Sequence, residues 1–222
     1  MRPGTLIRWA ALRPVLARVI RDGDIVLDIG GFDGKLAVFI KGNCSNVTVN
    51  VLDIDLKGLI IAQAEGLNTI AGIAENLPVA SEKIDVVLCL DIIEHLDDEV
   101  PFLEEVFRVM KKEGQLILTT PMEHGIVFPF MKQADVEKIN YEWGHKRLGY
   151  SLREIEVTVR NHGFVIESTI AYFNIITRFI YRILLLTKNP LPFTSWLFSK
   201  LVLLEPYIRC GAQEHIIVIR KF

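Results

Sequence analysis

The chain has 222 residues, a length that suits one domain of ordinary size with room for one insertion. Half of the residues are hydrophobic, which excludes a disordered chain, and the net charge of −2 excludes a general electrostatic attraction to nucleic acid. The three cysteines, Cys44, Cys89 and Cys210, are widely spaced without a CxxC pair, so we expect no disulfide framework and no zinc site, and a reducing cytoplasm fits best.

Short apolar runs alternate with segments of helical periodicity in the first half of the chain. This alternation is typical of βαβ units in a mostly parallel sheet. After an N-terminal helix over 5–20, the pattern predicts strands over 25–29, 47–52, 69–73, 84–90 and 115–120 and helices over 35–40, 56–65 and 100–110. The helix over 100–110 is expected to end in the basic and glycine residues 111–114.

The second half of the chain follows a different pattern. Residues 122–150 are expected to form a loop, and Ser151 with Glu154 three residues later predicts a capping box at the start of a helix over 151–161. Two more strands are predicted over 164–170 and 215–220, with an apolar insert at about 173–208 between them. We expect all of residues 1–222 to form a single domain.

A glycine-rich turn joins the first strand to the next helix. Glycine suits such a turn because the backbone must bend sharply and approach a ligand closely. Asp28, at the end of the strand, can accept hydrogen bonds from a cationic ligand group. The second strand ends at Asp53, where an acid can hold both hydroxyls of a ribose, and Ile54 then offers an apolar face to an adenine ring. Asp55 is the alternative acid.

The motifs DIGGFDG, VLDID, AENLP, IDVVLCLDIIEHL and EVFRVMKKEGQLILTTP follow one another in this order. This ordered set resembles the class I S-adenosylmethionine-dependent methyltransferases of the type 11 group, to which ubiquinone and menaquinone biosynthesis methyltransferases are related. The resemblance covers residues 24–121 and continues more weakly through 151–164 and the last strand. It implies a Rossmann-like α/β fold: a seven-stranded, mostly parallel sheet with an antiparallel last strand and helices on both faces.

The resemblance also implies S-adenosyl-L-methionine as the cofactor. The glycine turn would line its methionine and ribose part, and the end of the second strand would hold the ribose hydroxyls and one face of the adenine. The Ala-Glu pair of AENLP would lie at the adenine edge, and the Leu-Asp pair after the fourth strand would lie near the methionine and the reacting methyl. The residues so implied are Asp28, Gly30, Phe32, Gly34, Asp53, Ile54, Ala74, Glu75, Leu90 and Asp91.

Two positions depart from the family pattern. Phe32 occupies the middle position of the usual GxGxG turn, so a backbone contact there must tolerate a side chain. Ile73 stands where an acid commonly precedes the Ala-Glu pair, so that an adenine contact is either missing or made by Glu75.

Histidines are the candidates for acid–base chemistry. In related enzymes the segment after the fifth strand covers the acceptor site, and His145 there could take a proton from an acceptor hydroxyl, the alternative being a loop histidine packed on Trp143. Glu94 and His95 could act as a proton-transfer pair. The alternative is that Glu94 is an acidic residue at the start of a helix and His95 is a structural histidine. His124 is a weaker candidate. No metal-ligand cluster is visible, so we expect no metal.

The insert over 173–208 carries four basic residues and one acid among many large apolar residues. Three interpretations stay open: an element that lies on a membrane and collects a lipid-like acceptor, a homodimer interface, and a lid packed on the domain's own core. Five arginines and no acid in residues 1–21 favour the first. The longest uncharged run in this third, residues 189–199, is shorter than the roughly 18 residues that span a bilayer.

The sequence therefore predicts an S-adenosylmethionine-dependent methyltransferase for a small apolar or lipid-like acceptor. We expect it in the cytoplasm or peripherally at the inner face of the membrane, with no nucleic-acid partner. One alternative is an NAD-dependent oxidoreductase, which shares the glycine turn and Asp53, although the 91–95 segment and the last two strands disfavour it. The other is a methyltransferase-like binding subunit without activity.

Overall fold

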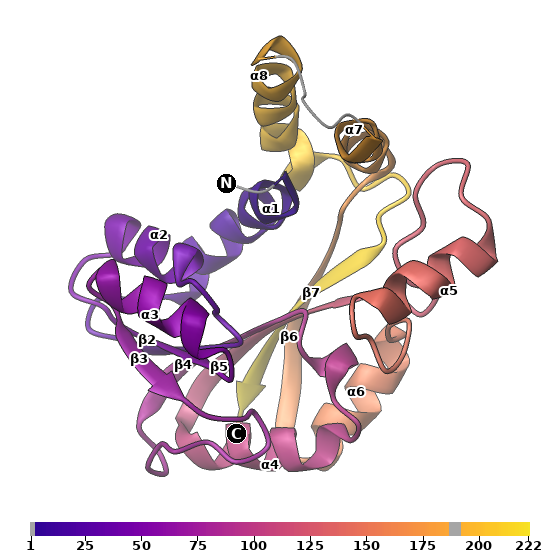
Figure 1. Cartoon of the computed structure of the whole chain (residues 1–222). Coiled ribbons are helices and arrows are strands. Elements are labelled where there is room, and N and C mark those ends of the chain that lie inside the picture. Colours follow the sequence, from indigo (N-terminus) through magenta and orange to yellow (C-terminus); the bar gives the residue numbers. More distant parts are fainter. Residues whose placement is uncertain (1–2, 187–191) are drawn as a thin grey trace.

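A computed structural model describes residues 3–186 and 192–222, which form one sheet covered by helices on both faces (Figure 1). The sheet has seven strands in the order β3-β2-β1-β4-β5-β7-β6. Strands β1 to β5 are parallel, and β7 runs antiparallel to both of its neighbours, which confirms the predicted fold. The strands are β1 (Ile25–Ile29), β2 (Thr48–Asp53), β3 (Asn68–Ala71), β4 (Ile84–Leu90), β5 (Met110–Pro121), β6 (Phe164–Tyr172) and β7 (Glu214–Lys221).

Two apolar layers hold the helices on the sheet. Neighbouring residues of a strand point to opposite faces, so Val26 of β1 belongs to one layer and Leu27 to the other. Helices α1 to α3 and the segment α8–η2 contribute to the first layer, and α4 and α6 to the second. The helices are α1 (Pro3–Val19), α2 (Lys35–Asn43), α3 (Leu56–Ala64), η1 (Ile93–His95), α4 (Glu99–Val109), α5 (Gln133–Glu142), α6 (Leu152–Asn161), α7 (Ile175–Leu186), α8 (Pro192–Leu201) and η2 (Val202–Tyr207).

The strand order reverses between β1 and β4, the two central strands of the parallel part. Ile29 pairs with Cys89 at their carboxyl ends, so the glycine turn and the residues after β4 emerge side by side. A reversal of strand order opens a crevice beyond the carboxyl ends, where open α/β sheets bind ligands. The fold therefore places two of the sequence motifs at one edge.

The structure corrects two of the predicted elements. The expected loop over 122–150 contains α5, whose sequence lacks a broad apolar stripe; Val136 and Asn140, one turn apart, are its buried side chains among those described. Residues 111–114 belong to β5 rather than to the end of a helix. Lys111 donates to Asp85 on the neighbouring strand at 2.8 Å, so this basic residue joins two strands instead of capping a helix.

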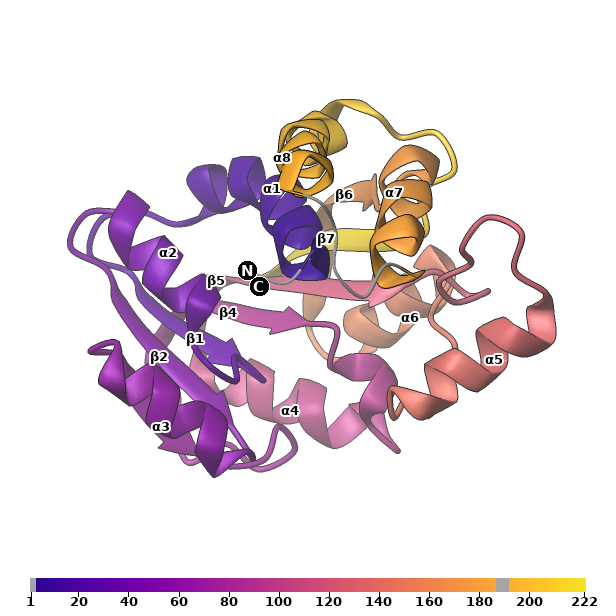
Figure 2. The ribbon, with the colours of Figure 1, turned by 45° about the horizontal axis from the view of Figure 1, so that its top comes forward.

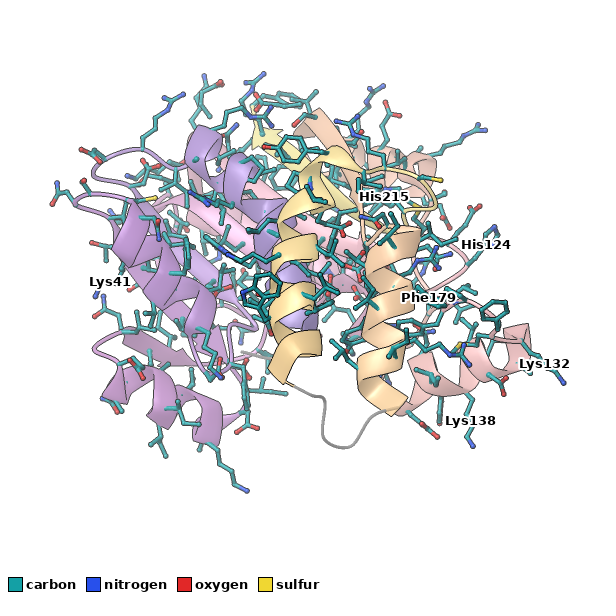
Figure 3. The ribbon with its side chains drawn as sticks, turned by 90° about the horizontal axis from the view of Figure 1, so that it is seen from above. Lys41, His124, Lys132, Lys138, Phe179 and His215 are labelled. Carbon is teal, nitrogen blue, oxygen red and sulfur yellow. The ribbon has the colours of Figure 1, made fainter. Side chains whose placement is uncertain are left out.

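The predicted insert over 173–208 forms α7, α8 and η2, apart from residues 187–191, which lie outside the described residues. Helices α7 and α8 lie side by side, close to α1 (Figures 2 and 3). Phe198 and Val202 are buried in the same apolar layer as Leu12 of α1, so one side of the insert packs on the domain itself. Within the described ranges, no helix is both long and apolar enough to cross a membrane.

Candidate active site

Two cavities meet at the carboxyl edge of the sheet, and Arg8, Gly30, Phe32 and Leu90 line both. The smaller, of about 180 Å³, lies between the glycine turn and α1. The larger, of about 680 Å³, is bounded by the residues after β4, the 122–150 segment, α7 and the ends of β6 and β7. The arrangement gives one chamber beside the glycine turn and a second, wider chamber that opens from it.

The glycine turn has a left-handed backbone at three positions: φ is 73° at Gly30, 45° at Phe32 and 68° at Gly34. A Cβ atom on Gly30 would collide with the side chain of Ile92, so this position needs glycine. Phe32 adopts the strained conformation with its ring against Gly58 of α3, where a Cβ atom would clash with that ring. The missing Cβ at Gly58 therefore makes room for the side chain that departs from the family pattern.

Asp28 lies under the glycine turn and is 2% exposed. Its Oδ2 atom has no hydrogen-bond partner among the described residues. Burial raises the pKa of this carboxyl to about 7, an effect that the charge of Arg8 opposes and that of Asp53 reinforces. A buried carboxylate with a free oxygen beside a cavity fits a cationic ligand group such as an ammonium.

Asp53 ends β2 next to the turn. Its Oδ2 atom accepts a hydrogen bond from the Phe32 amide and its Oδ1 atom one from the Asp55 amide, both at 2.8 Å. Each carboxylate oxygen can accept a second hydrogen bond, so both stay available to a diol. The alternative acid, Asp55, instead caps α3 by accepting from the amide of Lys57. The residues of the site therefore fit an adenosine-bearing ligand at the position the motifs indicate.

The residues expected around an adenine lie farther along this edge, and none of them lines either cavity. Ile54 is 73% exposed, Ala74 is buried and Glu75 is half-buried. The amide of Gly72 donates to the carbonyl oxygen of Asp53 at 3.2 Å, so the AENLP segment begins beside the end of β2. Ile73, in place of the usual acid, is half exposed.

Asp91 follows β4 in a left-handed conformation, with φ of 54°. Thr119 of β5 holds it from two directions: the Asp91 amide donates to the Thr119 carbonyl at 3.1 Å, and the Thr119 hydroxyl donates to Asp91 Oδ1 at 2.5 Å. The other carboxylate oxygen forms an ion pair with Arg8 of α1. Sequence reasoning assigned the N-terminal arginines to a surface cluster and missed Arg8, since nothing in its neighbourhood along the chain indicates a partner after β4.

Glu214 and Tyr172 are two buried polar residues that also line the larger cavity. Burial and the negative charge of Asp91 raise the pKa of Glu214 to about 8, against the effect of Arg8. This pair was not predicted, because both residues lie just outside the predicted strands over 164–170 and 215–220 and meet only when β6 and β7 pair.

The lining of the larger cavity also brings together Glu94, His95, Trp143 and His145. The rings of His95 and His145 meet edge to face with centroids 4.7 Å apart, and Trp143 lies 6.0 Å from His145. Burial and the neighbouring His95 lower the pKa of His145 to about 4, so its ring is neutral at pH 7. His124, by contrast, points outward from the molecule (Figure 3), is 79% exposed in its side chain and lines neither cavity.

Glu94 is fully buried, and burial raises the pKa of its carboxyl, with Asp91 adding to the shift. One ligand atom from each of Glu94, His95 and His145 lies within 4.8 Å of the others. Spacing along the chain, which led us to expect no metal-ligand cluster, does not reveal this group, because His145 is distant in sequence and meets η1 only in the fold.

Proteins of similar sequence and of similar fold include methyltransferases. Residues 27–118 match the model of a family described as a methyltransferase domain. The ubiquinone biosynthesis O-methyltransferase of Pseudomonas putida strain F1 is 31% identical over 115 residues, 46% of this chain and 47% of that protein. The chain thus spans about half the length of the curated relatives it matches.

Solved structures share the fold over nearly the whole chain. Phosphoethanolamine N-methyltransferase 2 of Haemonchus contortus, in complex with S-adenosyl-L-methionine, has a TM-score of 0.69 at 16% identity, covering 96% of this chain and 52% of that one. Geranyl diphosphate C-methyltransferase of Streptomyces coelicolor A3(2), in complex with Mg²⁺, geranyl diphosphate and S-adenosyl-L-homocysteine, has a TM-score of 0.69 at 13% identity, covering 96% and 76%. Residues 27–118 are therefore similar to a methyltransferase domain in sequence, and nearly the whole chain shares the fold of the solved methyltransferases.

Proposed function

We propose that this protein transfers a methyl group from S-adenosylmethionine to a hydroxyl of a small, apolar or lipid-like acceptor. The observation that carries the proposal is the junction of the two cavities at Gly30 and Leu90. One chamber adjoins the glycine turn and the other is wide enough for a second molecule. The family match and the neighbours solved with S-adenosylmethionine or its demethylated product support this cofactor.

On the cofactor side of the site, different residues would bind the different parts of S-adenosylmethionine. When bound, S-adenosylmethionine supplies an electrophilic methyl group on a sulfonium. Asp28 would accept hydrogen bonds from its ammonium, and Asp53 would accept them from its ribose hydroxyls. Gly30, Phe32, Gly34, Leu90 and Asp91 would line the middle of the molecule, with Ile54, Ala74 and Glu75 around the adenine.

The acceptor side combines apolar and polar walls. Ile126, Phe128 and Phe173 supply apolar surface, while Glu94, His95 and His145 are among its polar groups. Methyl transfer depends mainly on holding the nucleophile in line with the departing sulfur, so a shaped apolar chamber contributes by orientation. His145 would accept the proton of the acceptor hydroxyl. The named activity of the Pseudomonas relatives, O-methylation in ubiquinone biosynthesis, supports a quinone-like acceptor.

We further propose that the outer side of α7, α8 and η2 contacts a membrane surface that holds the acceptor. Large apolar side chains are exposed along α7 at Ile175, Ile176, Phe179 and Ile183, and Phe179 is labelled in Figure 3. Tyr181 of the same helix lines the larger cavity, so this apolar surface adjoins the chamber for the acceptor. Exposed apolar residues beside a binding chamber favour a partner that is itself apolar.

Labelled methyl transfer tests the proposed function. We expect label from S-adenosylmethionine to appear in a hydroxylated quinone-like compound with an isoprenoid tail, and less in the same ring without its tail. Cofactor binding without transfer to any tailed or tailless hydroxylated acceptor would favour a binding subunit. Thermal stabilisation by NAD but not by S-adenosylhomocysteine would favour an oxidoreductase instead.

A further inference from the structure

Three potential metal ligands converge on one wall of the larger cavity. Glu94 and His95 belong to η1, the single turn after β4, and His145 belongs to the loop after α5. One nitrogen or oxygen from each side chain lies within 4.8 Å of the other two. Two imidazoles and a carboxylate at such distances need only small side-chain adjustments to reach one ion at about 2.0–2.2 Å.

Backbone hydrogen bonds fix the loop of His145 against η1. The amide of Lys146 donates to the carbonyl oxygen of Glu94 at 2.8 Å, immediately after the histidine. The amide of His145 itself donates to the carbonyl oxygen of Asn140 at 3.1 Å, and the hydroxyl of Tyr150 donates to the carbonyl of Ile93 at 3.3 Å. The three side chains are therefore brought together by the fold rather than by chance proximity of mobile loops.

The cluster contains polar atoms that lack partners. Glu94 is 0% exposed; its Oε2 atom accepts from the Thr120 hydroxyl at 3.2 Å, but its Oε1 atom has no hydrogen-bond partner in the described part of the chain. The Nδ1 atom of His145 is likewise buried without one. Burying such groups unpaired costs free energy, which a cation that both atoms can ligate would offset.

We propose that Glu94, His95 and His145 bind a divalent transition-metal ion of the Zn²⁺ type at the acceptor end of the larger cavity. Two histidines and one carboxylate form a donor set that suits zinc and other first-row divalent ions. Three protein ligands leave a coordination position open, which is the arrangement of a catalytic rather than a structural site. The hydroxyl of Thr120 would orient the carboxylate from behind.

The role of the ion rests on the proposed function. An ion at this place would take the acceptor's hydroxyl oxygen as a ligand and lower its pKa, so that the proton leaves to water. The oxygen then forms its bond to the methyl carbon while the carbon–sulfur bond breaks and its electron pair stays on sulfur. In this arrangement His145 holds the ion instead of accepting the proton itself.

Metal binding by the chelator-treated protein of 222 residues tests the proposal without cofactor or acceptor. Titration with Co²⁺, followed by visible absorption, and with Zn²⁺, followed by calorimetry, should show one tight site per chain. We expect His95→Gln and His145→Gln each to weaken binding by about tenfold or more. His162→Gln is the matched control, because His162 lies at the end of α6 outside the cavity and should leave binding unchanged.

The proposal is overturned if neither ion binds, or if His95→Gln and His145→Gln bind as tightly as the wild type and the His162→Gln control. Binding of S-adenosylhomocysteine to the same samples shows that each variant is folded. It also separates the two claims: cofactor binding without metal binding removes the metal site alone, whereas metal binding without cofactor binding contradicts the proposed function.

Discussion

Arg8 of α1 forms an ion pair with Asp91, the residue that follows β4; Arg8 lines both cavities and Asp91 lines the larger one. The contact joins positions 83 residues apart and makes the N-terminal helix part of the site. Thr119 holds the same carboxylate from the sheet side. Helix α1 therefore covers the smaller cavity, and the ion pair ties this helix to the residue after the fourth strand.

Arg8→Ala should destabilise the protein by about 1–3 kcal/mol, because the largely buried Asp91 carboxylate loses its cation. Arg13→Ala is the matched control, since Arg13 is exposed on the same helix and should change stability by less than about 0.5 kcal/mol. Urea unfolding followed by circular dichroism measures both. Equal stabilities of the two variants would show that the ion pair contributes nothing to the position of α1.

Affinity for S-adenosylhomocysteine should rise about tenfold between pH 6 and pH 8 as Asp28, with its pKa raised to about 7, ionises beside the ligand's ammonium. The free protein should show the opposite trend in stability. The folded carboxyl keeps its proton above the ordinary pKa of 3.8, so stability falls as pH rises from about 4 to about 7. In Asp28→Asn, calorimetry should show no such rise in affinity with pH, and urea unfolding should show no such fall in stability. An unchanged pH profile in that variant would contradict the role of Asp28.

Gly30→Ala should destabilise the protein by about 1–3 kcal/mol, because φ is 73° and the added Cβ atom meets Ile92. Gly42→Ala offers a comparison within α2, where the new Cβ atom meets nothing within 4 Å. This second change should stabilise by about 0.5–1 kcal/mol through the higher helix propensity of alanine. Thermal unfolding of both variants checks the contrast, and a neutral Gly30→Ala would mean that the turn has another conformation.

Purified protein should co-sediment with phosphatidylglycerol vesicles at low salt, and Phe179→Glu should reduce the bound fraction several-fold by placing a charge on the exposed face of α7. Val157→Glu on α6 is the control, because Val157 is also exposed but lies on the other face of the sheet. Wild-type protein that stays in the supernatant as a dimer, and becomes monomeric with Phe179→Glu, would identify the surface as a homodimer interface instead.

Local sequence patterns located the glycine turn and the strand ends in the fold, whereas residues brought in by tertiary packing escaped prediction. The glycine turn and Asp53 could be predicted because a strand, a turn and an acid at a strand end are features of short segments. Arg8 and Glu214 reach the site only through tertiary packing, which periodicity does not report. Helix α5 escaped prediction because few of its side chains are buried, Val136 and Asn140 among them.

Calorimetric titration with S-adenosylhomocysteine tests the central claim most directly, using Asp53→Ala and Asp55→Ala as a matched pair. Wild-type protein should bind one equivalent, and Asp53→Ala should weaken binding by about tenfold or more through the loss of two charge-assisted hydrogen bonds to the ribose. Asp55→Ala removes the cap of α3 and costs about 1 kcal/mol of stability, yet should leave the affinity unchanged. No binding by the wild type, or equal affinity in the wild type and Asp53→Ala, would contradict the account.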